Sequence, residues 1–233
     1  MYVIGVAGQA QHGKDTLADH LQKLLNGPWF KEHADREYGV DILPMQHKHW
    51  ERGAFAKGVK KVYSDNFGVD TGFIERWKVK DEIPPGFDMN VRKSLQFIGD
   101  GFRQIKSSIW IDLALRGDEP RIISDVRYIN EFKRIHEEGG LNILVGRPDK
   151  LNDDPNPSEA QIKPYVEWCL RNYNIPVVRA PGDVANRPWL SNMPPHMEMF
   201  DIFIRNEKTL EEYYALIEEF VFPYVSVFDF KQR

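Results

Sequence analysis

The chain has few of the features that mark secreted or membrane-spanning proteins. Its 233 residues include one cysteine, Cys169, so no disulfide can form within the chain. No run approaches the roughly 20 apolar residues that cross a bilayer. The apolar segment 2–7 stops at a glycine, unlike the longer core of a secretory signal. We therefore expect no membrane partner and a cytoplasmic location.

An excess of positive charge is also absent. The 31 lysines and arginines are outnumbered by 35 acidic residues, for a net charge of -4. Proteins that bind nucleic acids gain affinity from clustered positive charge, so we expect no nucleic-acid partner. The hydrophobic fraction of 42% and the charged fraction of 28% are typical of a globular protein, and we expect one domain over 1–233. A homodimer is compatible with this composition.

Short apolar segments alternate with helical patterns along the chain. Residues 2–7 predict a buried strand, and leucines between 17 and 25 recur at helical spacing after a loop. A second strand is expected at 121–127, a helix at 130–138 and a third strand at 141–145. This order predicts an α/β fold with a parallel sheet flanked by helices.

Other segments have weaker signals. Helices are expected at 54–67 and 91–98, with a turn-rich stretch between them. Residues 148–195 hold nine of the fifteen prolines, with one short helix opening at Pro164, and they predict a proline-rich lid or insertion. Near the end, a capping box at Thr209 predicts the start of a last helix.

A glycine-containing loop, GQAQHGKDT at residues 8–16, joins the first strand to its helix and carries the clearest motif. We call it the glycine loop. It matches the GxxxxGK pattern of P-loop NTPases, in which Gly8 and Gly13 let the backbone turn its N–H groups toward phosphate oxygens. Lys14 would reach the β- and γ-phosphates and offset charge during transfer. The loop thus predicts ATP as a ligand.

The residue after the lysine departs from the usual motif. Asp15 stands where a serine or threonine normally contacts Mg²⁺, and Thr16 follows one place later. Either residue can meet the metal, directly or through water. His12 is expected to be a loop residue without a chemical role, because kinases act mainly by positioning and electrostatics.

The glycine loop and several later motifs resemble, in order, the phage-type deoxynucleoside monophosphate kinases. The other motifs are VRKSLQFIGD at 91–100, Trp110, ISDVRYINEFKRIHEEGG at 123–140 and ILVGRP at 143–148. The resemblance implies a nucleoside monophosphate kinase fold and ATP- and Mg²⁺-dependent conversion of deoxynucleoside monophosphates to diphosphates for DNA synthesis. For a viral protein, the location would be the host cytoplasm. Two alternatives stay open: a kinase like the animal phosphomevalonate kinases, which share a GKD loop, and a P-loop ATPase or nucleotide-sensing module.

Charged side chains follow two of the expected strands, where parallel sheets place their ligands. Asp125 could hold Mg²⁺, and Arg127 could stabilise the phosphoryl group in transfer. Arg147, at the end of the next strand, could close over ATP or be a plain surface residue. We therefore expect Asp125 and Arg127 to act with Lys14 in catalysis.

Residues for the phosphate acceptor are expected in the region of about 53–112. Arg92 and Gln96 are four apart on a predicted helix, so a guanidinium for a phosphate and an amide for a base edge share one face. That pair suits a deoxynucleoside monophosphate. Lys57, with its neighbouring lysines, could also line this site, although a solvated helix face explains these lysines equally well.

Overall fold

The chain forms two compact units in the computed structural model, which describes residues 2–28, 30, 48–151, 157–178 and 193–227. Unit 1 comprises Met1–Arg52 and Asp118–Arg233, and unit 2 comprises Gly53–Gly117. The region 53–112, predicted to bind the acceptor, lies within unit 2. None of the helices in these described ranges is long and apolar enough to cross a bilayer.

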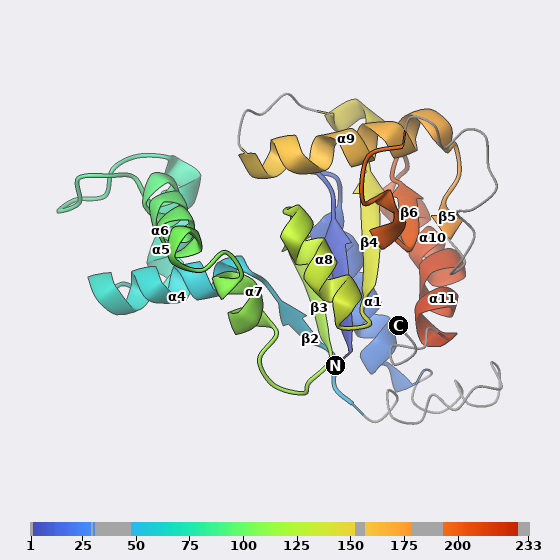
Figure 1. Cartoon of the computed structure of the whole chain (residues 1–233), viewed down its shortest axis with the longest axis horizontal. Coiled ribbons are helices and arrows are strands. Elements are labelled where there is room, and N and C mark those ends of the chain that lie inside the picture. The colour runs from blue at the N-terminus through green and yellow to red at the C-terminus, as the bar shows by residue number, and fades with distance from the viewer. Residues whose placement is uncertain (1, 29, 31–47, 152–156, 179–192, 228–233) are drawn as a thin grey trace. The chain divides into compact units, whose positions relative to one another are not determined.

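A six-stranded sheet forms the centre of unit 1, with the strand order β2-β3-β1-β4-β6-β5 (Figure 1). The strands are β1 (Val3–Ala7), β2 (Glu51–Gly53), β3 (Arg121–Val126), β4 (Leu141–Gly146), β5 (Val177–Val178) and β6 (Ile202–Arg205). β1 pairs in parallel with β3 and β4, and β4 with β6, whereas β5 pairs antiparallel with β6. The predicted α/β fold with a mostly parallel sheet flanked by helices is confirmed.

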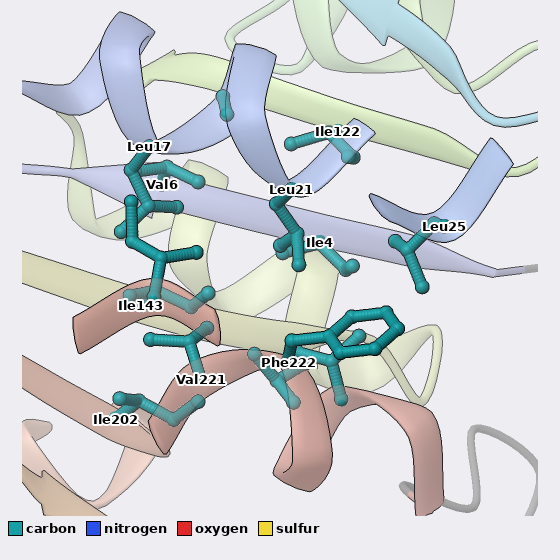
Figure 2. Packing of buried hydrophobic residues seen from close by; sticks show 14 of the residues in the cluster. Ile4, Val6, Leu17, Leu21, Leu25, Ile122, Ile143, Ile202, Val221 and Phe222 are labelled. Carbon is teal, nitrogen blue, oxygen red and sulfur yellow. The ribbon is translucent and has the colours of Figure 1, made fainter. Parts of the chain in front are cut away.

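The two faces of the sheet are covered by different helices. Ile4 and Val6 of β1 join a core cluster with Leu21 of α1 (Lys14–Asn26) and with side chains of the C-terminal helices (Figure 2). The C-terminal helices are α10 (Leu210–Leu216), the π-helical η4 (Ile217–Val221) and α11 (Phe222–Val227). Gly5 faces the other way, because a Cβ there would lie 2.7 Å from Ile135 of α8 (Ile129–Glu137). Helices therefore flank the sheet on both sides.

The helix after β4 is longer than the sequence predicts. The 3-10 helix η1 (Pro148–Lys150) follows β4, and α9 runs over Pro157–Asn172 with Pro164 inside it. The predicted start at Pro164 is wrong, because Ile162, Val166 and Cys169 are fully buried as α9 packs against β4. This burial outweighs the helix hydrogen bond that a proline removes. A lid role for 148–195 stays a prediction, and residues 152–156 and 179–192 lie outside the described ranges.

Unit 2 contains four helices in its described residues, all of which belong to the range 53–117. They are α4 (Ala56–Phe67), α5 (Thr71–Lys80), α6 (Val91–Ile105) and α7 (Ile109–Ala114). Tyr63, Ile74 and Val91 are buried together as a small separate core. Trp110 is also buried and donates from Nε1 to the Gly99 carbonyl at 3.0 Å, so it packs the unit. α5 lies where no helix was predicted.

The core of unit 1 supplies a stability prediction. Leu21 is fully buried between α1 and the sheet, whereas Leu210 is 51% exposed at the start of α10. Leu21→Ala should lower the free energy of unfolding by about 2–5 kcal/mol, because it removes buried methyl groups and leaves a cavity. Leu210→Ala should change it by less than about 0.5 kcal/mol. Urea unfolding followed by circular dichroism measures both, and equal losses would contradict this description of the core.

Candidate functional site

The glycine loop needs glycine at both ends for steric reasons. Gly8 has a φ of 147°, and a Cβ there would lie 2.4 Å from the Val145 carbonyl oxygen. Gly13 has a φ of 94°, and its Cβ would lie 2.6 Å from the Asn206 amide nitrogen. Other residues would be strained in these backbone conformations as well as crowded. The two glycines therefore let the loop pass close to β4 and to the segment after β6.

The loop runs into the start of α1, where backbone donors are left open. Gly13 occupies the N-cap position, and no side chain caps the first turn. The first N–H groups of a helix have no partner within the helix. Together with the helix dipole they favour an anion at this end.

Lys14 is a buried cation at the base of this turn. Its side chain folds back, and Nζ donates to the Gln9 carbonyl at 2.5 Å. Burial, followed by the positive charge of Arg127, lowers the pKa of the Lys14 amine to about 8, whereas the negative charge of Glu159 acts in the opposite direction. The amine is therefore positively charged at neutral pH and close to its titration range.

A buried carboxylate on α9 ties the loop to the end of β3. Glu159 is 3% exposed, and its two oxygens accept from the Ala10 backbone N–H at 3.0 Å and from Arg127 Nη1 at 2.5 Å. Arg127 follows β3 directly. Asp125 lies within that strand, and its negative charge acts to raise the pKa of Lys14. The predicted group of Lys14, Asp125 and Arg127 thus lies in one charged neighbourhood.

The strand register changes beside this neighbourhood. Gly5 of β1 is opposite Ile123, whereas Ala7 is opposite Val126, so β3 holds one extra residue at this point. Extra residues of this kind occur next to active sites, where they re-aim side chains. Here the irregularity falls in the part of β3 that carries Asp125.

A cavity of about 440 Å³ opens at the C-terminal side of the glycine loop. Its lining comes entirely from unit 1 and consists of Gln11, Gly13, Lys14, Asp15, Thr16, Arg147, Asn206, Lys208, Thr209, Leu210 and Tyr213. Arg147 therefore lines the same cavity as the glycine loop, with its Nε 3.0 Å from Asp149 Oδ1. The volume falls in the range of about 300–1,000 Å³ typical of small-ligand sites.

Side chains from later segments fix the loop carbonyls. Asn206 Nδ2 donates to the His12 carbonyl at 3.0 Å, and the Tyr213 hydroxyl donates to the Gly13 carbonyl at 3.3 Å. The His12 ring is buried, with Nδ1 3.2 Å from the Val145 carbonyl oxygen. Burial lowers the pKa of His12, which favours the neutral imidazole. His12 thus packs the loop against β4.

Asp15, the departure from the usual motif, is engaged by other side chains. Its Oδ1 accepts from Ser124 Oγ at 2.5 Å and from Arg52 Nη2 at 3.2 Å. Thr16 lines the cavity beside it. In the described part of the chain, no three His, Cys, Asp or Glu side chains gather closely enough to form a metal site by themselves.

The residues predicted to bind the acceptor all lie on helices of unit 2. Arg92 and Gln96 are exposed on α6, and Arg92 Nε is 3.9 Å from Asp81 Oδ1. Lys57 is exposed on α4, where it makes no ion pair with another described residue, unlike Lys60, which pairs with Glu75 at 2.5 Å. The side chains are thus accessible to a ligand.

Several residues that contact the glycine loop or the start of α1 were not predicted from the sequence. Asn206 directly follows a parallel strand, which is the same signal that predicts a site at Asp125. Glu159 had no signal, because the helix that carries it was expected to start later. Arg52 precedes no recognisable motif, and only the fold brings its strand beside the glycine loop.

Comparison with known proteins gives one informative similarity. No protein-family model matches the chain. A protein of Acanthamoeba polyphaga mimivirus, named "Putative deoxynucleotide monophosphate kinase", is 25% identical over 237 aligned residues, which cover 93% of this chain and 94% of that protein. The resemblance read from the motifs is confirmed. The similarity extends over almost the whole chain.

The charges around Lys14 predict opposite effects of two substitutions on its pKa. Arg127→Met removes a neighbouring positive charge and should raise the pKa of Lys14 above about 8, whereas Glu159→Gln removes a negative charge and should lower it. NMR titration of the lysine side chain measures both. Arg171→Met, on an exposed ion pair of α9, is the control and should cause no change. Shifts in the same direction for Arg127→Met and Glu159→Gln would contradict the assigned neighbourhood.

Proposed function

We propose that the chain transfers the γ-phosphoryl group of ATP to deoxynucleoside monophosphates and so makes the diphosphates. The observation that carries this proposal is the uncapped start of α1 with the buried Lys14, both of which line a cavity of about 440 Å³. Open N–H groups and a helix dipole bind phosphate, and a lysine can follow the charge as it moves. The similarity to the mimivirus protein supports the same activity.

The donor nucleotide fits the lining of the cavity. Its phosphates would bind backbone N–H groups of the glycine loop other than those of Ala10 and His12, which donate to Glu159 and to the Gln9 carbonyl, with Lys14 at the β- and γ-phosphates. Arg147 and Lys208, which also line the cavity, offer positive charge to the rest of the nucleotide. In this proposal Lys14 leaves the Gln9 carbonyl and donates to phosphate instead.

Transfer of the γ-phosphoryl group requires that the two substrates are held in position and that the negative charge of their phosphates is offset. An oxygen of the acceptor phosphate attacks the γ-phosphorus, the bond to the β-phosphate oxygen breaks, and ADP leaves, with no covalent intermediate on the protein. Arg127 would stabilise the moving phosphoryl group. Mg²⁺, held by Asp15, Thr16 or Asp125, directly or through water, would supply further positive charge at the β- and γ-oxygens.

The acceptor site is assigned to unit 2. Arg92 offers a guanidinium fork for the monophosphate, and Gln96, one turn along the same exposed helix face, offers an amide that can both donate to and accept from a base edge. Lys57 would add positive charge. A deoxynucleoside monophosphate uses all of these groups, whereas a phosphomevalonate skeleton has no base edge for the amide.

The deciding experiment is an assay of ADP release with ATP and Mg²⁺ over a panel of acceptors. The panel contains the deoxynucleoside and ribonucleoside monophosphates and phosphomevalonate. We expect ADP release that depends on a deoxynucleoside monophosphate, and Lys14→Met should lower this rate by about 100-fold or more, because a charge-stabilising donor is lost. Lys23→Met, an exposed lysine in the last turn of the same helix, is the matched control.

Two outcomes would overturn the proposal. Turnover with phosphomevalonate alone would identify a different acceptor. Steady ADP release without any acceptor would indicate an ATPase instead.

A second prediction separates the two substrates. Arg92→Ala should raise the KM for the monophosphate by about tenfold or more, since a charge-assisted hydrogen bond is lost. The KM for ATP should change by less than about twofold, because the lining of the donor cavity belongs to unit 1. Arg76→Ala, an exposed arginine on α5, is the control. Equal increases in both KM values would remove Arg92 from the acceptor site.

A further inference from the structure

Arg52 joins β2 to the first turns of α1 through hydrogen bonds from both of its terminal nitrogens. Its Nη1 donates to Asp19 Oδ1 at 2.5 Å and to the Asp15 carbonyl oxygen at 3.3 Å. Its Nη2 donates to Ser124 Oγ at 2.6 Å and to Asp15 Oδ1 at 3.2 Å. One guanidinium therefore contacts two carboxylates, a hydroxyl and a backbone carbonyl.

These contacts offset the negative charge of two aspartates in the first turns of α1. A neutral serine or threonine is usual after the lysine of the GxxxxGK pattern, and here Asp15 lines the cavity at that position. Asp19 adds a second negative charge one turn along the same helix. Carboxylates next to a polyphosphate repel it, because like charges at short range raise the free energy of the bound state. Arg52 supplies an offsetting positive charge.

The same contacts hold the Asp15 carboxylate in one orientation. Its Oδ1 accepts from both Arg52 and Ser124, and the hydroxyl of Ser124 is used twice, since it accepts from Arg52 and donates to Asp15. Oδ2 of Asp15 has no hydrogen-bond partner among the described residues. One oxygen is thereby fixed, and the other stays open to solvent.

We propose that Arg52 is a positioning residue for the nucleotide: it neutralises and orients Asp15, so that an acidic residue at the end of the glycine loop becomes compatible with polyphosphate binding. Ser124 acts together with Arg52, because its hydroxyl donates to the same oxygen of the Asp15 carboxylate. The inference rests on the proposed function, because it takes the cavity at the glycine loop as the nucleotide site.

A double-mutant cycle with a binding readout tests the inference. Calorimetry measures the Kd of ADP in the presence of EDTA, so that neither a metal ion nor an acceptor contributes. Arg52→Met, which keeps the length of the side chain, should weaken ADP binding by about tenfold, a size typical of coupling between contacting residues. Asp15→Thr restores the usual hydroxyl, and in that background Arg52→Met should change the Kd by less than about twofold.

Two further variants keep the test decisive. Arg171→Met, at an exposed ion pair on α9, should leave the Kd unchanged. Arg52→Lys keeps the charge without the fork and should recover part of the affinity, so it replaces Arg52→Met if that variant does not fold. The same loss in both Asp15 backgrounds, or no loss at all, would overturn the role of Arg52. Failure of the unmodified protein to bind ADP would instead reject the proposed function.

Discussion

The interaction on which the site depends is the tethering of the glycine-loop backbone by side chains that come from much later in the chain. Asn206 and Tyr213 take up the carbonyls of His12 and Gly13, and Glu159 takes up the Ala10 N–H. Polar groups near the surface of a loop would otherwise turn toward water or toward one another. With these carbonyls engaged, the loop has a defined path into α1, and the open donors of that helix remain at the cavity.

Charge compensation is the second constraint, and it operates on both sides of the loop. The buried Lys14 has a positive neighbour in Arg127, and Glu159 holds that guanidinium while favouring the charged amine. On the outer side, Arg52 contacts the carboxylate of Asp15. A cation buried without such compensation would tend to lose its proton. Under the proposed function, this balance keeps the site ready for an anionic ligand without a large excess of positive charge in its absence.

Local signals made part of this molecule predictable. The sequence predicts β1, the glycine loop and α1, because the apolar run, the glycines and the leucine spacing lie within 25 residues. The contacts of Arg52 with Asp15 and of Glu159 with Ala10 join residues 37 and 149 positions apart, and no local pattern encodes such pairs. The start of α9 was missed because burial against β4 overrides the local effect of Pro164. The roles of Lys57, Arg92 and Gln96 stay predictions, since an exposed helix face looks the same with or without a ligand.

The attachment of unit 2 has a consequence for how chains of this architecture can diversify. The chain leaves unit 1 after Arg52 and returns to it at Asp118. Two hydrogen bonds join the segments on either side of unit 2. The Glu51 N–H donates to the Pro120 carbonyl at 2.9 Å, and Lys48 Nζ donates to the Asp118 carbonyl at 3.1 Å. A segment whose two ends lie close together can be inserted or replaced as a unit. Recombination or laboratory grafting could exchange it for another while the register of the sheet stays intact.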